Sequence, residues 1–140
     1  MNFFSMLMVI LATVTYHICQ KSINTSVNPA VSLIGSYGIA IITSTFAFII
    51  MPHDHGLIES FKQLNPASYI LGFSAFTLEL GYFYVYRSGW NIAVAPIFAN
   101  IITAVILILI GILIYKTKIT LTNIMGIMLS IMGLILINKK

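Results

Sequence analysis

Long apolar segments separated by short polar ones organise this chain. Five of them have 17 to 25 residues, and a helix needs roughly 20 apolar residues to cross a bilayer. They are Phe3–Cys19, Ala30–Met51, Ser68–Tyr86, Asn91–Tyr115 and Ile119–Ile137. Because a backbone inside lipid must satisfy its hydrogen bonds internally, these segments predict five transmembrane helices. The expected fold class is therefore all-α integral membrane, with residues 1–140 forming one five-helix domain.

The longest connection, residues 52–67, carries an apolar stripe of its own. Its apolar positions recur at i, i+1, i+4 and i+7, while its charged and amide side chains fall elsewhere. These positions are Leu57, Ile58, Phe61 and Leu64. The spacing predicts a short helix that lies in the membrane interface.

The composition supports a membrane protein. Hydrophobic residues make up 59% of the chain and charged residues 7%, whereas a soluble domain has about a quarter charged residues. A soluble enzyme, a disordered tail and a nucleic-acid-binding protein are therefore excluded. The net charge of +4 is scattered, without a basic run that could follow a phosphate backbone. We expect a multi-pass protein of the cell membrane, in contact with lipids and without a nucleic-acid partner.

Motifs for enzymatic chemistry are absent from the sequence. There is no glycine-rich phosphate loop, and three acidic residues leave no Ser-His-Asp or paired-carboxylate arrangement. His53, Asp54 and His55 resemble metal ligands, but adjacent loop residues rarely present a closed ligand set, so a solvated loop is favoured over zinc. The sequence predicts no enzymatic activity, no metal and no cofactor.

The basic residues give little guidance on orientation. Five spans place them on two sides of the membrane, as Lys62, Lys116 and Lys118 on one side and Lys21, Arg87, Lys139 and Lys140 on the other. The positive-inside rule needs a larger asymmetry to act on. Either lipids and the insertion machinery decide the orientation, or copies insert both ways and pair antiparallel in a dual topology.

Glu79 is the only acidic residue within a predicted span. It lies two residues from the middle of Ser68–Tyr86, hence about 3 Å from the midplane along a helix. An ionisable group at that depth is costly and by default functional, so Glu79 could carry a proton or pair with a cationic substrate. The alternative is a protonated side chain that hydrogen-bonds a neighbouring helix.

Other polar residues accompany Glu79 inside the spans. A stripe of Thr13, Tyr16, His17 and Gln20 occupies one face of the first helix. It predicts either a cavity lining or hydrogen bonds between packed helices.

Two further candidates lie in the third and fourth spans. Tyr82 shares a face with Glu79 and suits an organic cation. In the fourth span, Pro96 is expected to kink the helix, and Asn100, one turn later, could contact substrate or be a buried amide.

Several stretches resemble known transporters. In the last span, Gly126, Ser130 and Gly133 share one face of the run 124–138, which looks like the dimerisation helix of small multidrug resistance transporters. The stretch 81–96, with its turn and following proline, and the turn 116–122 are similar to the drug/metabolite transporter superfamily. Thr13 stands where the four-helix family has a glutamate in its first helix.

The resemblance implies a half-size, five-helix EamA-like unit, one half of an inverted-repeat transporter. Its expected activity is secondary transport as an antiparallel homodimer through Gly126, Ser130 and Gly133. The substrate would be a small neutral, zwitterionic or cationic metabolite or drug, with proton coupling as one option. The alternatives are a non-transporting membrane subunit that binds a partner protein, or a subunit of a lipid-linked sugar flippase.

Overall fold

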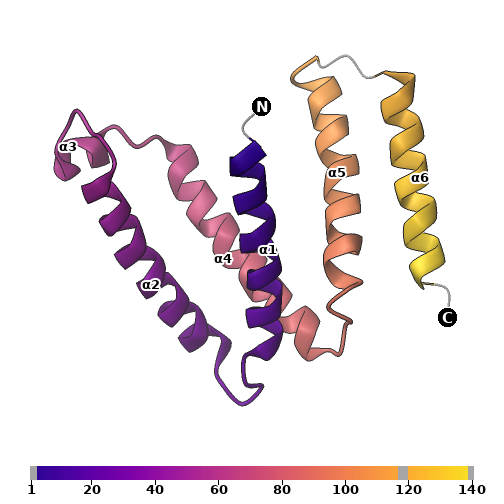
Figure 1. Ribbon diagram of the computed structural model, residues 1–140, viewed down its shortest axis with the longest axis horizontal. Coiled ribbons are helices and arrows are strands. Elements are labelled where there is room, and N and C mark those ends of the chain that lie inside the picture. Colours follow the sequence, from indigo (N-terminus) through magenta and orange to yellow (C-terminus); the bar gives the residue numbers. More distant parts are fainter. Residues whose placement is uncertain (1–2, 117–119, 139–140) are drawn as a thin grey trace. The chain divides into compact units, whose positions relative to one another are not determined.

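The computed structural model describes residues 3–116 and 120–138, and every regular element in these ranges is a helix. All-helical architecture is thereby confirmed for this part of the chain. Some residues that were counted in the predicted spans or among the basic residues lie outside the described residues, namely Lys118, Ile119, Lys139 and Lys140. The helices are α1 (Phe3–Ser22), α2 (Pro29–Ile50), α3 (Leu57–Lys62), α4 (Pro66–Arg87), α5 (Ala95–Leu113) and α6 (Leu121–Asn138) (Figure 1).

The chain divides into two compact units. The first contains α1 to α4 and ends at Ser88, and the second begins at Gly89 and contains α5 and α6. Gly89 has a φ of +90°, in the left-handed region that glycine adopts without steric cost. That the predicted spans form a single domain stays a prediction.

Three helices among the described residues are long and apolar enough to cross a membrane. They are α1 with 20 residues, α2 with 22 and α5 with 19, and each approaches or exceeds the roughly 20 residues that a bilayer requires. The 22 residues of α4 include more polar side chains, and α6 has a shorter apolar stretch, Leu121–Gly133. The protein is therefore a membrane protein by the length and composition of its helices.

Asparagine followed by proline starts two of the helices. The Asn28 side chain accepts a hydrogen bond of 2.9 Å from the backbone N–H of Ala30, and Asn65 accepts one of 3.3 Å from Ser68. Each following proline lies in the first helical turn, where its missing N–H would have had no partner within the helix. As a result, α4 begins two residues before the predicted start of its span.

The start of α5 corrects the expectation about Pro96. Asn91 accepts a hydrogen bond of 2.8 Å from the backbone N–H of Ala93 and holds a turn, so the helix begins at Ala95 and not at Asn91. Pro96 therefore lies in the first turn, with no preceding helix to bend. The expected kink at Pro96 is wrong.

Many hydroxyl side chains of the long helices bond to their own backbone. Each of these donors reaches a carbonyl one turn earlier at 2.7–3.0 Å, as in Thr15 to Leu11, Ser74 to Ile70 and Thr77 to Phe73. A hydroxyl satisfied in this way needs neither water nor a neighbouring helix. These residues are therefore compatible with a lipid-facing position.

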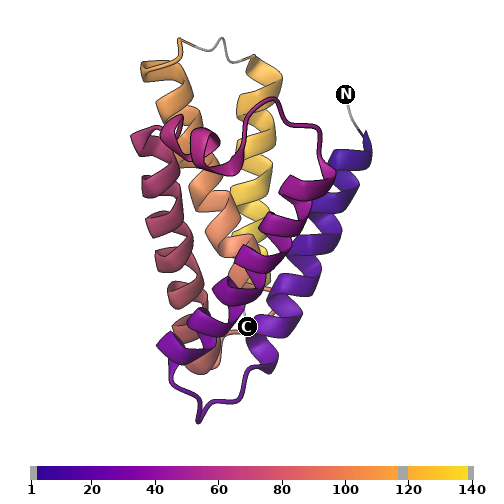
Figure 2. The ribbon, with the colours of Figure 1, turned by 90° about the vertical axis from the view of Figure 1, so that its left-hand side faces the viewer.

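Helix α4 holds the first unit together by contacting both α1 and α2. In Figure 2, α2 and α4 approach each other at their lower ends and diverge toward α3. Leu33, Phe83 and Tyr86 are the buried large side chains of this unit, together with the polar Gln20. The core of the first unit therefore lies at the end where α1 and α4 finish and α2 begins.

Candidate functional site

Polar and aromatic side chains of α1 and α4 meet inside the first unit. We call them the α1–α4 cluster. On α1, Gln20 follows the adjacent pair Tyr16 and His17 by one turn, and the α4 positions are three and four residues apart, so each set forms one face. The members are Tyr16, His17 and Gln20 from α1, and Glu79, Tyr82 and Tyr86 from α4.

Two hydrogen bonds join the helices within the cluster. The Gln20 side-chain amide donates to the backbone carbonyl of Glu79 at 2.8 Å, and only 7% of Gln20 is exposed. The Tyr86 hydroxyl and Nδ1 of His17 share a second bond of 3.0 Å, in which the tautomer of His17 decides the donor. The polar face of α1 is thus directed onto α4.

Aromatic contacts fill the space around His17. Its ring centroid lies 4.8 Å from that of Tyr82 and 5.0 Å from that of Tyr16, both edge to face. Tyr82 and Tyr86 stack at 5.9 Å. Such arrangements are the preferred ones for aromatic quadrupoles, so His17 is held by packing as well as by its hydrogen bond.

Glu79 lies among tyrosines. Its carboxyl interacts electrostatically with the hydroxyls of Tyr16 and Tyr37, the latter on α2. Both hydroxyl oxygens are buried, and the Tyr37 hydroxyl is within hydrogen-bonding reach of the Glu79 carboxyl. Within residues 3–116 and 120–138, the one ion pair is His55 with Glu59, so no described cation neutralises Glu79. A carboxyl beside two tyrosine hydroxyls can bind a proton, a cation or a hydrogen-bond donor.

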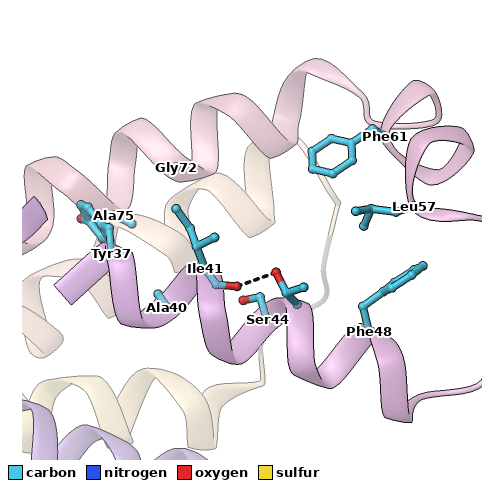
Figure 3. A pocket seen from close by; sticks show the side chains of 10 residues that line it. Tyr37, Ala40, Ile41, Ser44, Phe48, Leu57, Phe61, Gly72 and Ala75 are labelled. Atoms are coloured by element: carbon cyan, nitrogen blue, oxygen red, sulfur yellow. Dashed lines mark hydrogen bonds between the residues drawn. The ribbon is translucent and has the colours of Figure 1, made fainter. Parts of the chain in front are cut away.

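A cavity of about 730 Å³ separates α2 from α4 beside Glu79; we call it the α2–α4 cavity. Figure 3 shows Tyr37 and Ala75 at one end and Leu57 and Phe61 of α3 at the other. Tyr37 both lines this cavity and reaches Glu79. Tyr37 therefore connects the cavity wall to the α1–α4 cluster.

Two predicted site residues lie apart from these contacts. The Thr13 hydroxyl is exposed and donates to the carbonyl of Val9, one turn earlier in its own helix, at 2.8 Å. Asn100 belongs to the second unit. There it lines a cavity of about 410 Å³ between α5 and α6.

The predicted dimer contacts lie in the same second unit. Gly126 and Ser130 line the α5–α6 cavity with Asn100, and Gly133 does not. The Ser130 hydroxyl donates to the carbonyl of Gly126 at 2.9 Å. A role of these three residues in dimerisation stays a prediction.

Arg87 is a structural residue whose contacts the sequence did not reveal. Its Nη2 donates to the carbonyls of Val27 and Asn24 in the α1–α2 loop. The guanidinium carbon lies 4.1 Å from the ring centroid of Phe83, a cation–π distance. Arg87 therefore fixes the α1–α2 loop to the end of α4.

The His53-Asp54-His55 run makes local contacts. His53 stacks on Phe48 at 4.4 Å, and its Nδ1 lies 3.0 Å from the carbonyl of Met51. His55 lies 3.7 Å from the Glu59 carboxylate. In the described part of the chain, no three metal-ligating side chains come together.

No protein family, curated protein or solved structure matches this chain. Arguments about its function therefore depend on its own residues.

Proposed function

We propose that this protein is a secondary transporter of the drug/metabolite type, working as an antiparallel homodimer. The observation that supports it is the carboxyl of Glu79 on α4. It lies between Tyr16 of α1 and Tyr37 of α2, without a described cationic partner. With α4 and α6 included, five helices cross the membrane and form one half of an inverted-repeat transporter, in which substrate binds near the midplane.

The substrate is a small neutral, zwitterionic or cationic compound. An ionised carboxyl at membrane depth is costly unless a proton or a cation neutralises it. A proton and a cationic substrate therefore compete for Glu79, which couples their movements. Tyr16 and Tyr82 add aromatic faces for a cation. Because an ionised Glu79 repels negative charge, organic anions are excluded.

A ligand screen on the purified protein tests this substrate class. A compound that binds the folded state increases the free energy of unfolding by mass action, by about 2.7 kcal/mol at a hundred times its Kd, and so raises the melting temperature. We expect stabilisation by amines or amino acids and a loss of that effect in Glu79→Gln. Stabilisation by organic anions alone would overturn the proposal.

The proposed homodimer would cover part of the exposed apolar helices. Side chains such as Ile41, Phe73 and Leu129 are more than half exposed, so lipid or a further chain must cover them. Two oppositely inserted copies would recreate the inverted repeat. We place α6 at the interface through Gly126, Ser130 and Gly133, whose small side chains allow close helix approach.

Cysteine labelling tests the dual topology. Thr25 in the α1–α2 loop and Asp54 in the α2–α3 loop are exposed and lie beyond opposite ends of α2. In a Cys19→Ser background, we expect Thr25→Cys and Asp54→Cys each to react with an impermeant maleimide on about half of the copies. Labelling of one site on all copies and of the other on none would exclude dual topology. Co-purification of a distinct membrane protein in fixed ratio would favour a partner-binding subunit.

A further inference from the structure

The α2–α4 cavity is large, and carbon atoms form most of its walls. Its volume of about 730 Å³ lies within the usual range for small-molecule sites, roughly 300–1,000 Å³. Ala40, Ile41, Phe48 and Ala75 contribute aliphatic or aromatic walls. Among the hydroxyls, Thr45 already donates to the carbonyl of Ile41 at 2.8 Å. Such walls offer water too few hydrogen bonds to hold it.

The cavity lies beside a surface that suits hydrocarbon. Helix α2 is one of the membrane-crossing candidates, and large apolar side chains follow the lining residues on both helices. Ile41 and its neighbour Ile42 are 67% and 64% exposed, and Phe73 next to Gly72 is 71% exposed. The apolar space is thus continuous with the lipid-facing surface, where flexible acyl chains are the most abundant apolar groups.

Helix α3 closes one end of the cavity and gives the occupant a direction. Leu57 and Phe61 project into the cavity from α3 (Figure 3). The same short helix carries Glu59 in its first turn and Lys62 in its last. An amphipathic helix of this kind lies at headgroup level. A chain inside the cavity therefore has its polar end beside α3 and its apolar end toward Tyr37.

Gly72 leaves the cavity open from the α4 side. A Cβ atom built at Gly72 would meet no atom within 4 Å, so a larger side chain there enters empty space without displacing the backbone. The same holds for Gly81, on the same helix, which does not line the cavity. Filling the cavity and substituting a helical glycine can therefore be tested separately.

We propose that the α2–α4 cavity holds one acyl chain of a membrane phospholipid, with its headgroup beside α3. This site is independent of Glu79 and of transport, since it depends on the cavity, its lipid-facing surroundings and the amphipathic α3. The acyl chain stabilises the separated arrangement of α2 and α4, because it supplies the packing contacts that the empty α2–α4 cavity lacks.

Photocrosslinking in vesicles tests the site. The full-length protein is reconstituted in phosphatidylcholine containing a fraction with a diazirine in one acyl chain, irradiated, and mapped by mass spectrometry. We expect more labelling at Ala40 and Ala75, which line the cavity, than at Ile42 and Phe73, which do not. Gly72→Leu should reduce cavity labelling by about tenfold, equivalent to about 1.4 kcal/mol, while Gly81→Leu leaves it unchanged.

A second cavity-filling variant and compounds that compete with the lipid probe distinguish the possible outcomes. Ser44→Leu fills the same cavity from α2, so it should reproduce the loss if Gly72→Leu does not fold. Equal labelling of residues that line the cavity and residues that do not, or labelling that survives both substitutions, overturns the proposal. Crosslinks from the cavity to a second copy would assign it to a protein interface. Displacement by amines that also requires Glu79 would assign it to the transported substrate.

Discussion

Glu79→Gln is expected to abolish coupled transport while the protein still folds and assembles. The amide keeps the size and hydrogen-bonding capacity of the carboxyl, but it neither binds a proton nor neutralises a cation. The hydrogen bond from Gln20 goes to the backbone carbonyl of residue 79 and survives the substitution. The measurement is substrate uptake into proteoliposomes driven by a proton gradient, compared with gel filtration of the same sample.

Glu59→Gln is the matched control. Glu59 is an exposed carboxylate on α3 that pairs with His55, and exposed pairs contribute about 0.2–1 kcal/mol. We expect its uptake to equal that of the unmodified protein. If Glu79→Gln transports normally at every pH tested, Glu79 is a packing residue. If uptake is absent even for the unmodified protein with any ligand found in the screen, a subunit role replaces transport.

Arg87→Ala is expected to lower the thermal stability of the protein more than any substitution of another single basic residue. It removes hydrogen bonds to Asn24 and Val27 and the contact with Phe83. Hydrogen bonds from a charged group contribute about 1.5–3 kcal/mol, which corresponds to roughly 3–10 °C in melting temperature for a chain of this size. The measurement is the apparent melting temperature in a mild detergent.

Two variants define what Arg87 contributes. Arg87→Lys keeps the charge but loses the planar guanidinium, so it should recover only part of the stability. Lys62→Ala removes an exposed cation from α3 and should leave melting unchanged. A melting temperature for Arg87→Ala equal to that of Lys62→Ala would contradict an anchoring role.

Local patterns in the sequence predicted the helices better than their starting points. Apolar length alone identified the long helices, because lipid imposes that length. The starts depend on capping: Asn65 and Pro66 begin α4 earlier than apolarity indicates, and Asn91 delays α5. Both signals are local, so capping rules applied to each asparagine could have found them.

The composition of the candidate site was partly predictable. Helical spacing placed Tyr16, His17 and Gln20 on one face, and the structure brings that face to Glu79 and Tyr82 on α4. Spacing could not reveal which helix would be the partner. Thr13 shares the same face, yet its hydroxyl is satisfied within its own helix.

Contacts between distant segments were beyond the sequence pattern. Arg87 binds carbonyls about sixty residues earlier, and backbone acceptors have no signature in residue types. Tyr37 could be recognised as a wall of the α2–α4 cavity only once the divergence of α2 from α4 was known.

The self-bonded hydroxyls have a consequence for motion. Thr43 and Thr45 of α2 donate their hydroxyls to carbonyls of their own helix. They therefore need no hydrogen-bond partner outside α2. A helix of this kind can exchange a protein neighbour for lipid without breaking a hydrogen bond. Gln20 and Arg87, in contrast, tie α1 and its loop to α4. When the first unit rearranges, we therefore expect α2 to move relative to a fixed α1–α4 pair. The separation of α2 from α4 should cost least free energy at the end beside α3.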